Sequence, residues 1–442
     1  MLETAGSTQV LRASCWHEDD GYVISLFTAD DAADIPSAFR EVYGRDYLNP
    51  LVYDAAAFAR LAGSGDQISL IARDGAGAFA GHVALAFSAP NRGVVELCQG
   101  IVVPAHRRSG IFARMIDRAL EFARTALGAQ AVMGISLTNH TISQKVVAQR
   151  GFREVGLELD YVPQRMLVHE EVDGPAATLV QYLDFDLALT APCYLPPSYA
   201  AWFSDLLDGA AVSGQRQISA ASGLDRRASL CEPKDMPRFD MTRLVMRRVG
   251  FDFWNLVAAH ETEAEAAGRR SLQILINLGS AEGAAAVELL RGWGYACSGL
   301  LPCYLEDGQH VAIMYRGFAA PHFSGIRLHG QGPEAMLATV IEDWQRAERL
   351  GAELRHLDLA ERHEPAPAEQ SGPSRLDAVN SMETVRQLLG ITGRVRLETG
   401  GMAPLGAKAA DGKAPRAPNK STGKSACGPA PPGARKEGAA PN

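Results

Sequence analysis

The sequence predicts a mixed α+β protein in which helices flank a mostly antiparallel, twisted sheet. Short apolar runs rich in β-branched residues follow one another closely between residues 21 and 103, and strands so close in sequence pair antiparallel. From Gly110 the apolar spacing changes to the period of an amphipathic helix. The strand-like run 131–137 follows that helix, so it should pair parallel to the strand before it.

Helix-capping and turn residues place the elements of this first part in order. Thr28 and the following Asp residues cap a first helix, the turn Asp74-Gly-Ala-Gly77 joins two strands, and Gly151 ends the last helix. The expected elements are strand 21–27, helices 30–42 and 54–61, strands 67–73, 78–87 and 94–103, a helix from residue 110, strand 131–137, helix 139–150 and strand 154–161.

Composition limits the class of protein. With 442 residues, two or more domains are expected, and 47% hydrophobic with 21% charged residues is typical of a globular chain. The net charge of −8 argues against nucleic acid as a partner, and no run is long and apolar enough to cross a membrane. Seven scattered cysteines without Cys-x-x-Cys spacing indicate reduced thiols in a cytoplasmic protein. No spacing of His, Cys and carboxylates predicts a metal site.

Changes in composition divide the chain. Residues 403–442 contain almost no large apolar side chains and cannot bury enough surface to fold, whereas 334–350 form an amphipathic helical pattern. The expected division is a flexible leader over 1–20 that is not a secretory signal, a first domain over 21–175, a second over 176–320, a helical extension over 321–360 and a mostly disordered tail over 361–442.

The stretch from Glu96 to Ile116 predicts a site for phosphate. A buried strand ends at Pro104, the basic turn Arg107-Arg108-Ser109-Gly110 follows, and a helix begins. The first N–H groups of a helix have no internal partner and the helix dipole favours negative charge there. Gly110 lets an anion approach the backbone closely, and two arginines add positive charge. The alternative is an ordinary turn with solvated arginines.

This stretch resembles motif A of the GNAT-type N-acetyltransferase superfamily, in which a Val-x-Pro sequence precedes Arg/Gln-x-x-Gly-x-Gly/Ala. Phe112 departs from it, because a small residue is usual at that place. Asn139 to Phe152 resembles motif B, with Ser143 at the usual Ala and Val147 at the usual Tyr. The resemblance implies a GNAT-like fold and a site for acetyl-CoA, or another acyl-CoA. The implied cofactor-binding residues are Ile101, Val102, Val103, Arg107, Arg108, Ser109, Gly110, Ile111, Phe112, Asn139 and Ser143.

The resemblance also implies a function: an N-acyltransferase, with acetyl as the expected group, that acts on an amine of a small molecule or peptide. Glu96 would be the general base, acting through water; alternatively it pairs with a neighbouring strand or faces solvent. Tyr43, Tyr47 and Tyr53 would line the acceptor site, or simply pack their loop. With Val147 in place of the tyrosine, water or Ser143 would have to protonate the departing thiolate. The alternative function is a non-catalytic acyl-CoA sensor.

Other polar residues have simpler explanations. Cys98 lies on the same strand face as Glu96, so an acyl-cysteine step is conceivable, but a buried, inert thiol is the simpler interpretation. His82 and His106 are weaker candidates for a base, since each is more simply a polar residue of the structure.

The second half shows a weak internal repeat. Trp293-Gly-Tyr-Ala-Cys-Ser-Gly-Leu300 echoes Arg150-Gly-Phe-Arg-Glu-Val-Gly-Leu157, which predicts a second, degenerate GNAT-like domain. It has no counterpart of the basic turn, and residues 255–265 are acidic where that turn and its helix should lie. We therefore expect this half to be a scaffold or a wall of the acceptor pocket rather than a second site for coenzyme A. The sequence does not indicate the oligomeric state.

Overall fold

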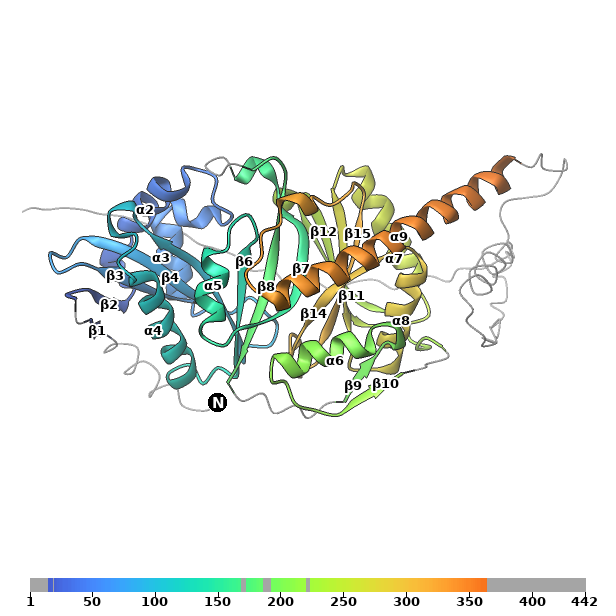
Figure 1. The fold of residues 1–442 in the computed structure, drawn as a ribbon, viewed down its shortest axis with the longest axis horizontal. Coiled ribbons are helices and arrows are strands. Elements are labelled where there is room, and N and C mark those ends of the chain that lie inside the picture. The colour runs from blue at the N-terminus through green and yellow to red at the C-terminus, as the bar shows by residue number, and fades with distance from the viewer. Residues whose placement is uncertain (1–14, 19, 168–171, 186–191, 220–222, 364–442) are drawn as a thin grey trace, which may run out of the picture. The chain divides into compact units, whose positions relative to one another are not determined.

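The computed structural model describes residues 15–18, 20–167, 172–185, 192–219 and 223–363 (Figure 1). Within them, thirteen strands form one sheet in the order β1-β2-β3-β4-β5-β6-β8-β7-β14-β15-β13-β12-β11, and β9 and β10 form a separate parallel pair. Helices flank the large sheet, and most neighbouring strands are antiparallel. The predicted fold class is therefore confirmed.

The strands and helices have the following bounds. The strands are β1 (Cys15–His17), β2 (Val23–Leu26), β3 (Gln67–Arg73), β4 (Phe79–Ala86), β5 (Val94–Val102), β6 (Ala131–Leu137), β7 (Arg153–Val162), β8 (Ala176–Asp184), β9 (Cys193–Leu195), β10 (Arg216–Ile218), β11 (Leu230–Met236), β12 (Met241–Arg248), β13 (Ser271–Asn277), β14 (Ala296–Leu301) and β15 (Val311–Gly317). The α-helices are α2 (Asp34–Tyr43), α3 (Ala55–Gly63), α4 (Ile111–Thr125), α5 (Ile142–Ala148), α6 (Ala200–Gly209), α7 (Phe253–Ala266), α8 (Ala281–Gly292) and α9 (Gln331–His363). Short 3₁₀ turns are η1 (Ala29–Asp31), η2 (Pro50–Tyr53), η3 (Pro104–His106), η4 (Gln164–Met166), η5 (Pro197–Tyr199), η6 (Pro237–Phe239) and η7 (Phe323–Gly325).

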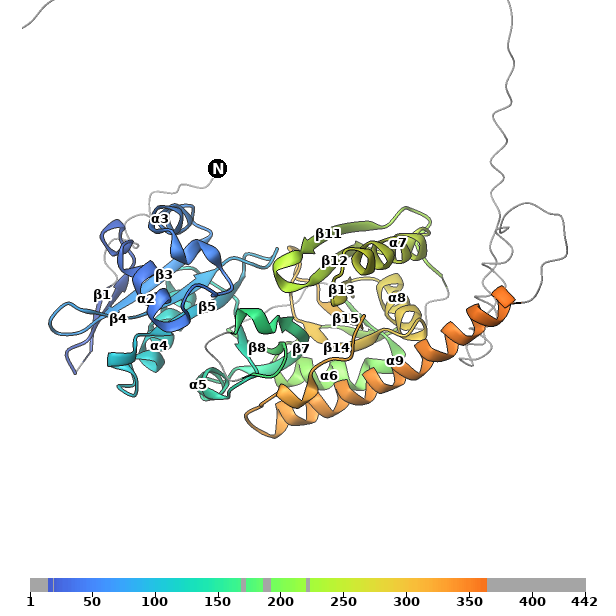
Figure 2. The ribbon, with the colours of Figure 1, turned by 90° about the horizontal axis from the view of Figure 1, so that it is seen from above.

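Helices cover both faces of the first half of the sheet. Because successive residues of a strand point to opposite faces, Leu70 of β3 packs in the core beneath α4 whereas Ile71 packs in the core beneath α2 and α3. Figure 2 shows α3 and α4 on opposite sides of these strands. The apolar stripe predicted for α4 is the buried one, with Met115 and Ile116 fully inside.

Strand β5 leaves its neighbour β6 part-way along. The two strands pair in parallel only from Val94 with Ala131 to Leu97 with Gly134, although both strands continue beyond these residues. A bulge follows on the other edge of β5, where Gln99 has a positive φ of 53° and the register to β4 shifts. Beyond Leu97, the backbone groups of β5 on this edge therefore do not pair with β6.

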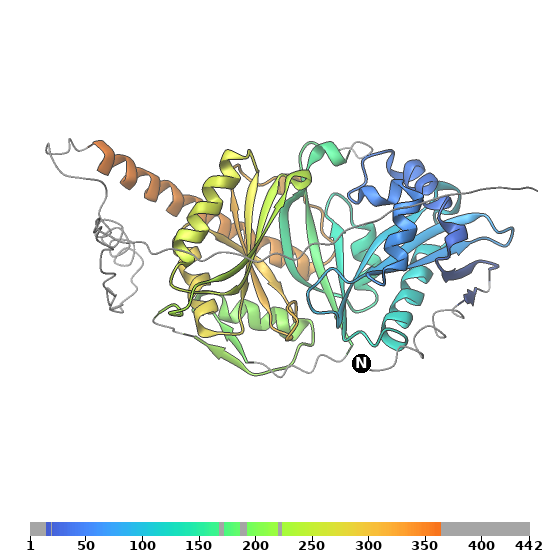
Figure 3. The ribbon, with the colours of Figure 1, turned by 180° about the vertical axis from the view of Figure 1, so that it is seen from behind.

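The second half repeats a strand order of the first. In the first half, β5 is parallel to β6, and β8 and β7 follow antiparallel. In the second, β12 is parallel to β13, and β15 and β14 follow antiparallel. Figure 3 shows these strands from behind, in front of α9, which packs on β14 and β7. The predicted degenerate repeat remains a proposal that this order supports.

The two halves join where β7 meets β14. Gly156 pairs with Gly299, and a Cβ placed on Gly299 would lie only 2.4 Å from the Cα of Gly156 and 2.4 Å from the carbonyl oxygen of Val155. Side chains on both sides then form one core, which includes Leu157 of β7 and Ile313 of β15. Glycine at this crossing is what lets the sheet continue from one half into the other.

The domain boundaries remain proposals, and the strand pairing refines two of them. β8 begins at Ala176 but lies between β6 and β7, so we place the end of the first domain after Asp184 rather than at residue 175. Cys15–His17, within the expected leader, pair with β2 as β1. Residues 1–14 and 364–442, with nearly all of the expected tail, lie outside the described residues. No helix among the described residues has the length and apolar character that crossing a membrane requires.

Substituting Gly299 by alanine should weaken the junction between the halves. The added methyl group collides with the β7 backbone, so we expect the free energy of unfolding to fall by about 1–3 kcal/mol. Urea unfolding of Gly299→Ala measures this loss. Gly308→Ala is the matched control, because Gly308 also has a positive φ, 77°, but nothing within 4 Å of its Cβ position. Equal losses in the two variants would contradict a close approach at Gly299.

Candidate active site

The basic turn sits at the end of β5 and opens α4. Gly110 is the N-cap with a left-handed φ of 81°, and it has no side chain to cap the helix. Ser109 steadies the turn, since its Oγ donates to the carbonyl oxygen of His106 at 2.8 Å and accepts from the Ile111 N–H at 3.2 Å. Arg107 and Arg108 are exposed, and neither pairs with a carboxylate of the described chain. Apart from the Ile111 N–H, the first amides of α4 have no side-chain cap, and with two unpaired guanidinium groups they make a site suited to a diphosphate.

The bulky Phe112 turns inward from this site. Its ring lies over the backbone of Gly100, where an added Cβ would come within 2.7 Å of the ring. Ile101 and Ile111 are buried as core residues, and Val102 is half-buried beside the α4 face. What β5 offers a ligand here is thus its backbone edge, not these side chains.

The segment that enters α5 follows β6 along the chain. Asn139 and Ser143 are both half-buried, Asn139 before the helix and Ser143 within its first turn. Val147, at the place of the usual tyrosine, is 4% exposed and packs in the core with Phe152. Because this side chain is a valine and is buried, α5 supplies no phenol that could protonate the thiolate leaving an acyl-CoA.

The three predicted tyrosines gather on the other face of the sheet, beside α2. The rings of Tyr43 and Tyr47 lie 4.9 Å apart, and the Tyr47 N–H donates to the Tyr53 hydroxyl at 2.9 Å. Burial raises the pKa of Tyr47 well above its usual value, and the nearby Tyr43, Cys98 and Glu96 raise it further. Of these three tyrosines, Tyr47 is therefore the one whose pKa Glu96 raises, and all three also pack their loop.

Glu96 points from β5 toward this same face. Burial raises the pKa of its carboxyl group. A hydrogen bond from Ser88 and the positive charge of Arg243 oppose the rise, whereas the negative charge of Glu158 adds to it. A carboxylate with a raised pKa is a better proton acceptor than an ordinary one, which suits a general base.

Cys98 is half-buried and His82 is fully buried, and both have shifted pKa values. Burial raises the pKa of the Cys98 thiol well above its usual value, and the charge of Glu96 adds to this. His82 is fully buried, and burial lowers its pKa to about 4. The neutral imidazole donates its Nδ1–H to the carbonyl oxygen of Gln99 at 2.9 Å, so it holds the bulge of β5. The third candidate, His106, contacts the Tyr22 hydroxyl at 3.0 Å.

Sequence reasoning missed a polar cluster near Glu96 that residues of both halves form. Glu158 of β7 is buried and forms an ion pair with Arg243 of β12, and it also accepts from the hydroxyl of Thr178 at 3.1 Å. Tyr161 lies beside Arg243, with the guanidinium 5.6 Å from the ring centroid. The available signal was a charged residue inside each apolar strand, but nothing in the sequence shows that the two strands meet.

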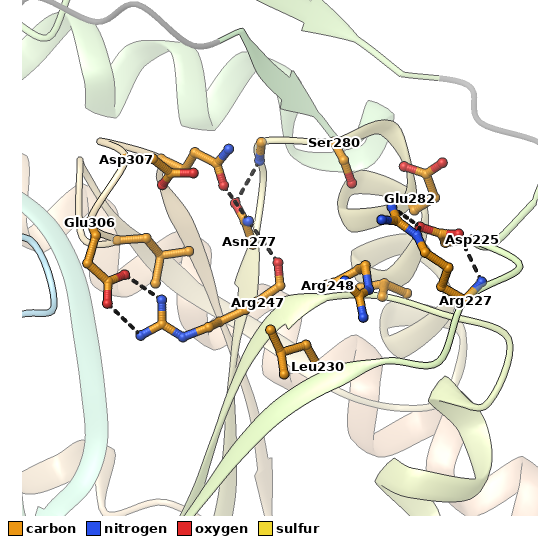
Figure 4. A pocket seen from close by; sticks show the side chains of 14 residues that line it. Asp225, Arg227, Leu230, Arg247, Arg248, Asn277, Ser280, Glu282, Glu306 and Asp307 are labelled. Atoms are coloured by element: carbon orange, nitrogen blue, oxygen red, sulfur yellow. Dashed lines mark hydrogen bonds and ion pairs between the residues drawn. The ribbon is translucent and has the colours of Figure 1, made fainter.

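A cavity of about 510 Å³ lies in the second half, at the ends of β12 and β13. Its charged groups are largely engaged: Figure 4 shows Arg247 reaching Glu306, and Arg227 reaching Asp225. Here β12 and β13 stay paired as far as Met246 with Ile276, so they do not part as β5 and β6 do. No group of three or more His, Cys, Asp or Glu side chains in the described chain is placed to hold a metal ion.

The start of α7 also differs from the start of α4, because an acidic residue precedes it. The residue before α7 is Asp252, whose carboxylate accepts the Ser229 N–H at 2.7 Å, and this hydrogen bond lowers its pKa. A negative charge therefore occupies the place where Gly110 stands in the first half, and it would repel a phosphate.

The comparison with family models agrees with the motifs of the first half. Residues 33–152 match the model of the acetyltransferase (GNAT) family, so the predicted family is confirmed for this segment. Among solved structures, a ribosomal-protein-S5-alanine acetyltransferase from Vibrio fischeri is 14% identical with a TM-score of 0.33, over 39% of this chain and 98% of that one. A spermidine N-acetyltransferase from Vibrio cholerae, solved with CoA and spermine, is 16% identical with a TM-score of 0.31, over 38% and 96%. No curated protein matches.

The raised pKa of the half-buried Cys98 predicts that its thiol reacts slowly. With iodoacetamide at mildly alkaline pH, we expect the exposed Cys15 to be alkylated at least about tenfold faster than Cys98, because only a thiolate attacks. Mass spectrometry of the two peptides measures both rates, and denatured protein, in which the rates should converge, is the control. Equal rates in the folded protein would point instead to a reactive Cys98.

Proposed function

We propose that this protein is an acyl-CoA-dependent N-acyltransferase, with acetyl as the expected acyl group and a primary amine of a small molecule or peptide as the acceptor. The observation that carries the proposal is the start of α4. The helix start at Gly110, where Ser109 accepts only the Ile111 N–H, and two unpaired arginines lie at the end of a strand that has parted from its neighbour. The GNAT family model over residues 33–152 supports the same reaction class.

The residues of the turn and of β5 fit an acyl-CoA. Amides at the start of α4 and the guanidinium groups of Arg107 and Arg108 would hold the diphosphate. The free edge of β5 beyond Leu97 would hydrogen-bond the amide-containing arm, and an N–H of the bulge at Gln99 would stabilise charge on the carbonyl oxygen. The bound thioester supplies an acyl carbon that a neutral amine can attack.

Glu96 would take the proton that the amine loses. It lies on the face that also carries Tyr47, and its raised pKa suits this role, either directly or through water. Tyr43, Tyr47 and Tyr53 would form one side of the acceptor site. Since Val147 is buried in the core, water or Ser143 would return a proton to the leaving thiolate.

A second candidate function is an acyl-CoA sensor without turnover. The buried Val147 and the ring of Phe112 over Gly100 favour it, because both depart from the catalytic pattern of the family. Release of free thiol from acetyl-CoA across a panel of amines separates the two functions, because a sensor would bind coenzyme A tightly and release no free thiol.

We place the protein in the cytoplasm for either function, in agreement with six described cysteines that are all free.

Reversing the charge of the turn should weaken the binding of coenzyme A. We expect Arg107→Glu/Arg108→Glu to lose roughly 10- to 100-fold in affinity, the size of one or two charged hydrogen bonds. Isothermal titration calorimetry with coenzyme A measures the change. Arg124→Glu is the matched control, since Arg124 is an exposed arginine in the last turn of the same helix. Unchanged affinity in the double variant would remove the basis of the proposal.

The pH profile should report Glu96. A base must be ionised to accept a proton, so the rate should fall as pH drops through a pKa above the ordinary 4.5 of a glutamate. Glu96→Gln should lower kcat by about 10²- to 10⁴-fold and leave affinity for coenzyme A unchanged. Glu41→Gln, an exposed glutamate of α2, serves as the control. An acidic limb that survives in Glu96→Gln would assign the base elsewhere.

A further inference from the structure

The polar cluster beyond Glu96 is composed of residues from both halves. Glu158 comes from β7, whereas Arg243 and Gln273 come from the neighbouring strands β12 and β13. Arg243 is paired with Glu158, and the Nε2 of Gln273 lies 3.5 Å from the same carboxylate. The side chains of Glu158 and Arg243 are only 5% and 14% exposed, so this is an interior site.

The strand registers place Glu158 on the face that carries Glu96. Glu96 pairs with Met133 of β6, and Leu137 lies on the same face of β6 because side chains alternate. Leu137 pairs with Thr178 of β8, which pairs with Glu158 and donates to its carboxylate. The cluster and the candidate base therefore face the same side of the sheet, where β5 has already parted from β6.

Two buried polar atoms of the cluster have no partner among the described residues. Arg243 donates to Glu158 through Nη2, but its buried Nε has no acceptor, and the buried Oε1 of Gln273 has no donor. A buried polar group without a partner destabilises the folded protein, so native structures rarely leave two such groups together without a ligand or water. One atom is a cationic donor suited to a carboxylate, and the other is a neutral acceptor suited to an N–H group.

We infer that the acceptor is an amino acid, a small molecule that carries both a primary amine and a carboxylate. Arg243 binds the carboxylate through Nε, Gln273 accepts a hydrogen bond from the amine or from a neighbouring N–H, and Glu96 faces the amine. This inference rests on the proposed function of the same site. Arg243 and Gln273 are thus specificity residues that the second half contributes, and Glu158 holds the guanidinium in place.

The experiment compares amino acids with the amines that lack their carboxylate. The full chain is titrated, without acetyl-CoA, with glycine and methylamine, β-alanine and ethylamine, 4-aminobutyrate and propylamine, leucine and isoamylamine, and tyrosine and tyramine. Thiol release from acetyl-CoA is then measured with each compound. We expect at least one acid to bind and to be acetylated with a KM at least about tenfold below that of its matched amine, the size of one charged hydrogen bond.

Variants locate the effect. Arg243→Lys keeps a positive charge beside Glu158 but loses Nε, so it should raise the KM of the preferred acid about tenfold or more, with kcat and the matched amine little changed. Gln273→Leu, which leaves the ion pair intact, should also weaken acid binding. Arg270→Lys is the matched control, because Arg270 also forms an ion pair between the halves, with the buried Asp160 at 2.7 Å.

The outcomes separate this inference from the proposed function. If an acid binds through Arg243 but no thiol is released, the acceptor site stands and the transferase proposal fails. If amines bind and react as well as their acids, if no acid binds, or if Arg243→Lys affects acid and amine equally, the inference is overturned while acyl transfer can still hold. If Arg270→Lys changes the kinetics as much as Arg243→Lys does, the Arg243 effect is a general loosening of the junction, and the inference is also overturned.

Discussion

The parting of β5 from β6 after Leu97 is the constraint on which the rest of the structure depends. Backbone groups inside a protein need partners, and two strands that separate leave a row of them free. Specific contacts fix the bulge of β5 at Gln99, directly after the separation. Gln99 adopts a positive φ of 53°, the imidazole of His82 donates to its carbonyl group, and the side chain of Gln67 pairs with its amide at 2.7 Å. A strand edge held in this way is prepared for a ligand that hydrogen-bonds like a strand.

The two halves share a strand order but differ at the place where this edge is exposed. In the first half a left-handed glycine and unpaired arginines follow β5, whereas in the second half β12 stays paired with β13 and Asp252 precedes the helix. The two halves therefore differ in the charge before the helix and in the pairing of the strands, which are the two features that the proposed anion site requires. This contrast supports a division of labour in which the first half holds the donor and the second half shapes the acceptor side.

The contacts between the halves favour that division. Arg238 donates to the carbonyl oxygen of Tyr47 at 2.7 Å, so the second half holds the loop that carries the predicted acceptor tyrosines. The Glu158–Arg243 pair is buried, and a buried ion pair is seldom worth more to stability than apolar residues of the same size. Its presence beside Glu96 is easier to understand as recognition than as support, particularly since one of its nitrogen atoms has no protein partner.

The sequence by itself determined the local features of this protein. Apolar spacing placed β3 and β6 at their observed bounds, and the turn from Arg107 to Gly110 marked the candidate anion site, because strand period, helix period and helix capping are properties of neighbouring residues. Only the tertiary structure decided which distant residues share the site with Glu96. Arg243 and Gln273 lie far along the chain, and the place of β8 between β6 and β7 was equally invisible to local patterns. Strand order and the curvature of a sheet follow from packing over the whole core, and no single stretch of sequence contains that information.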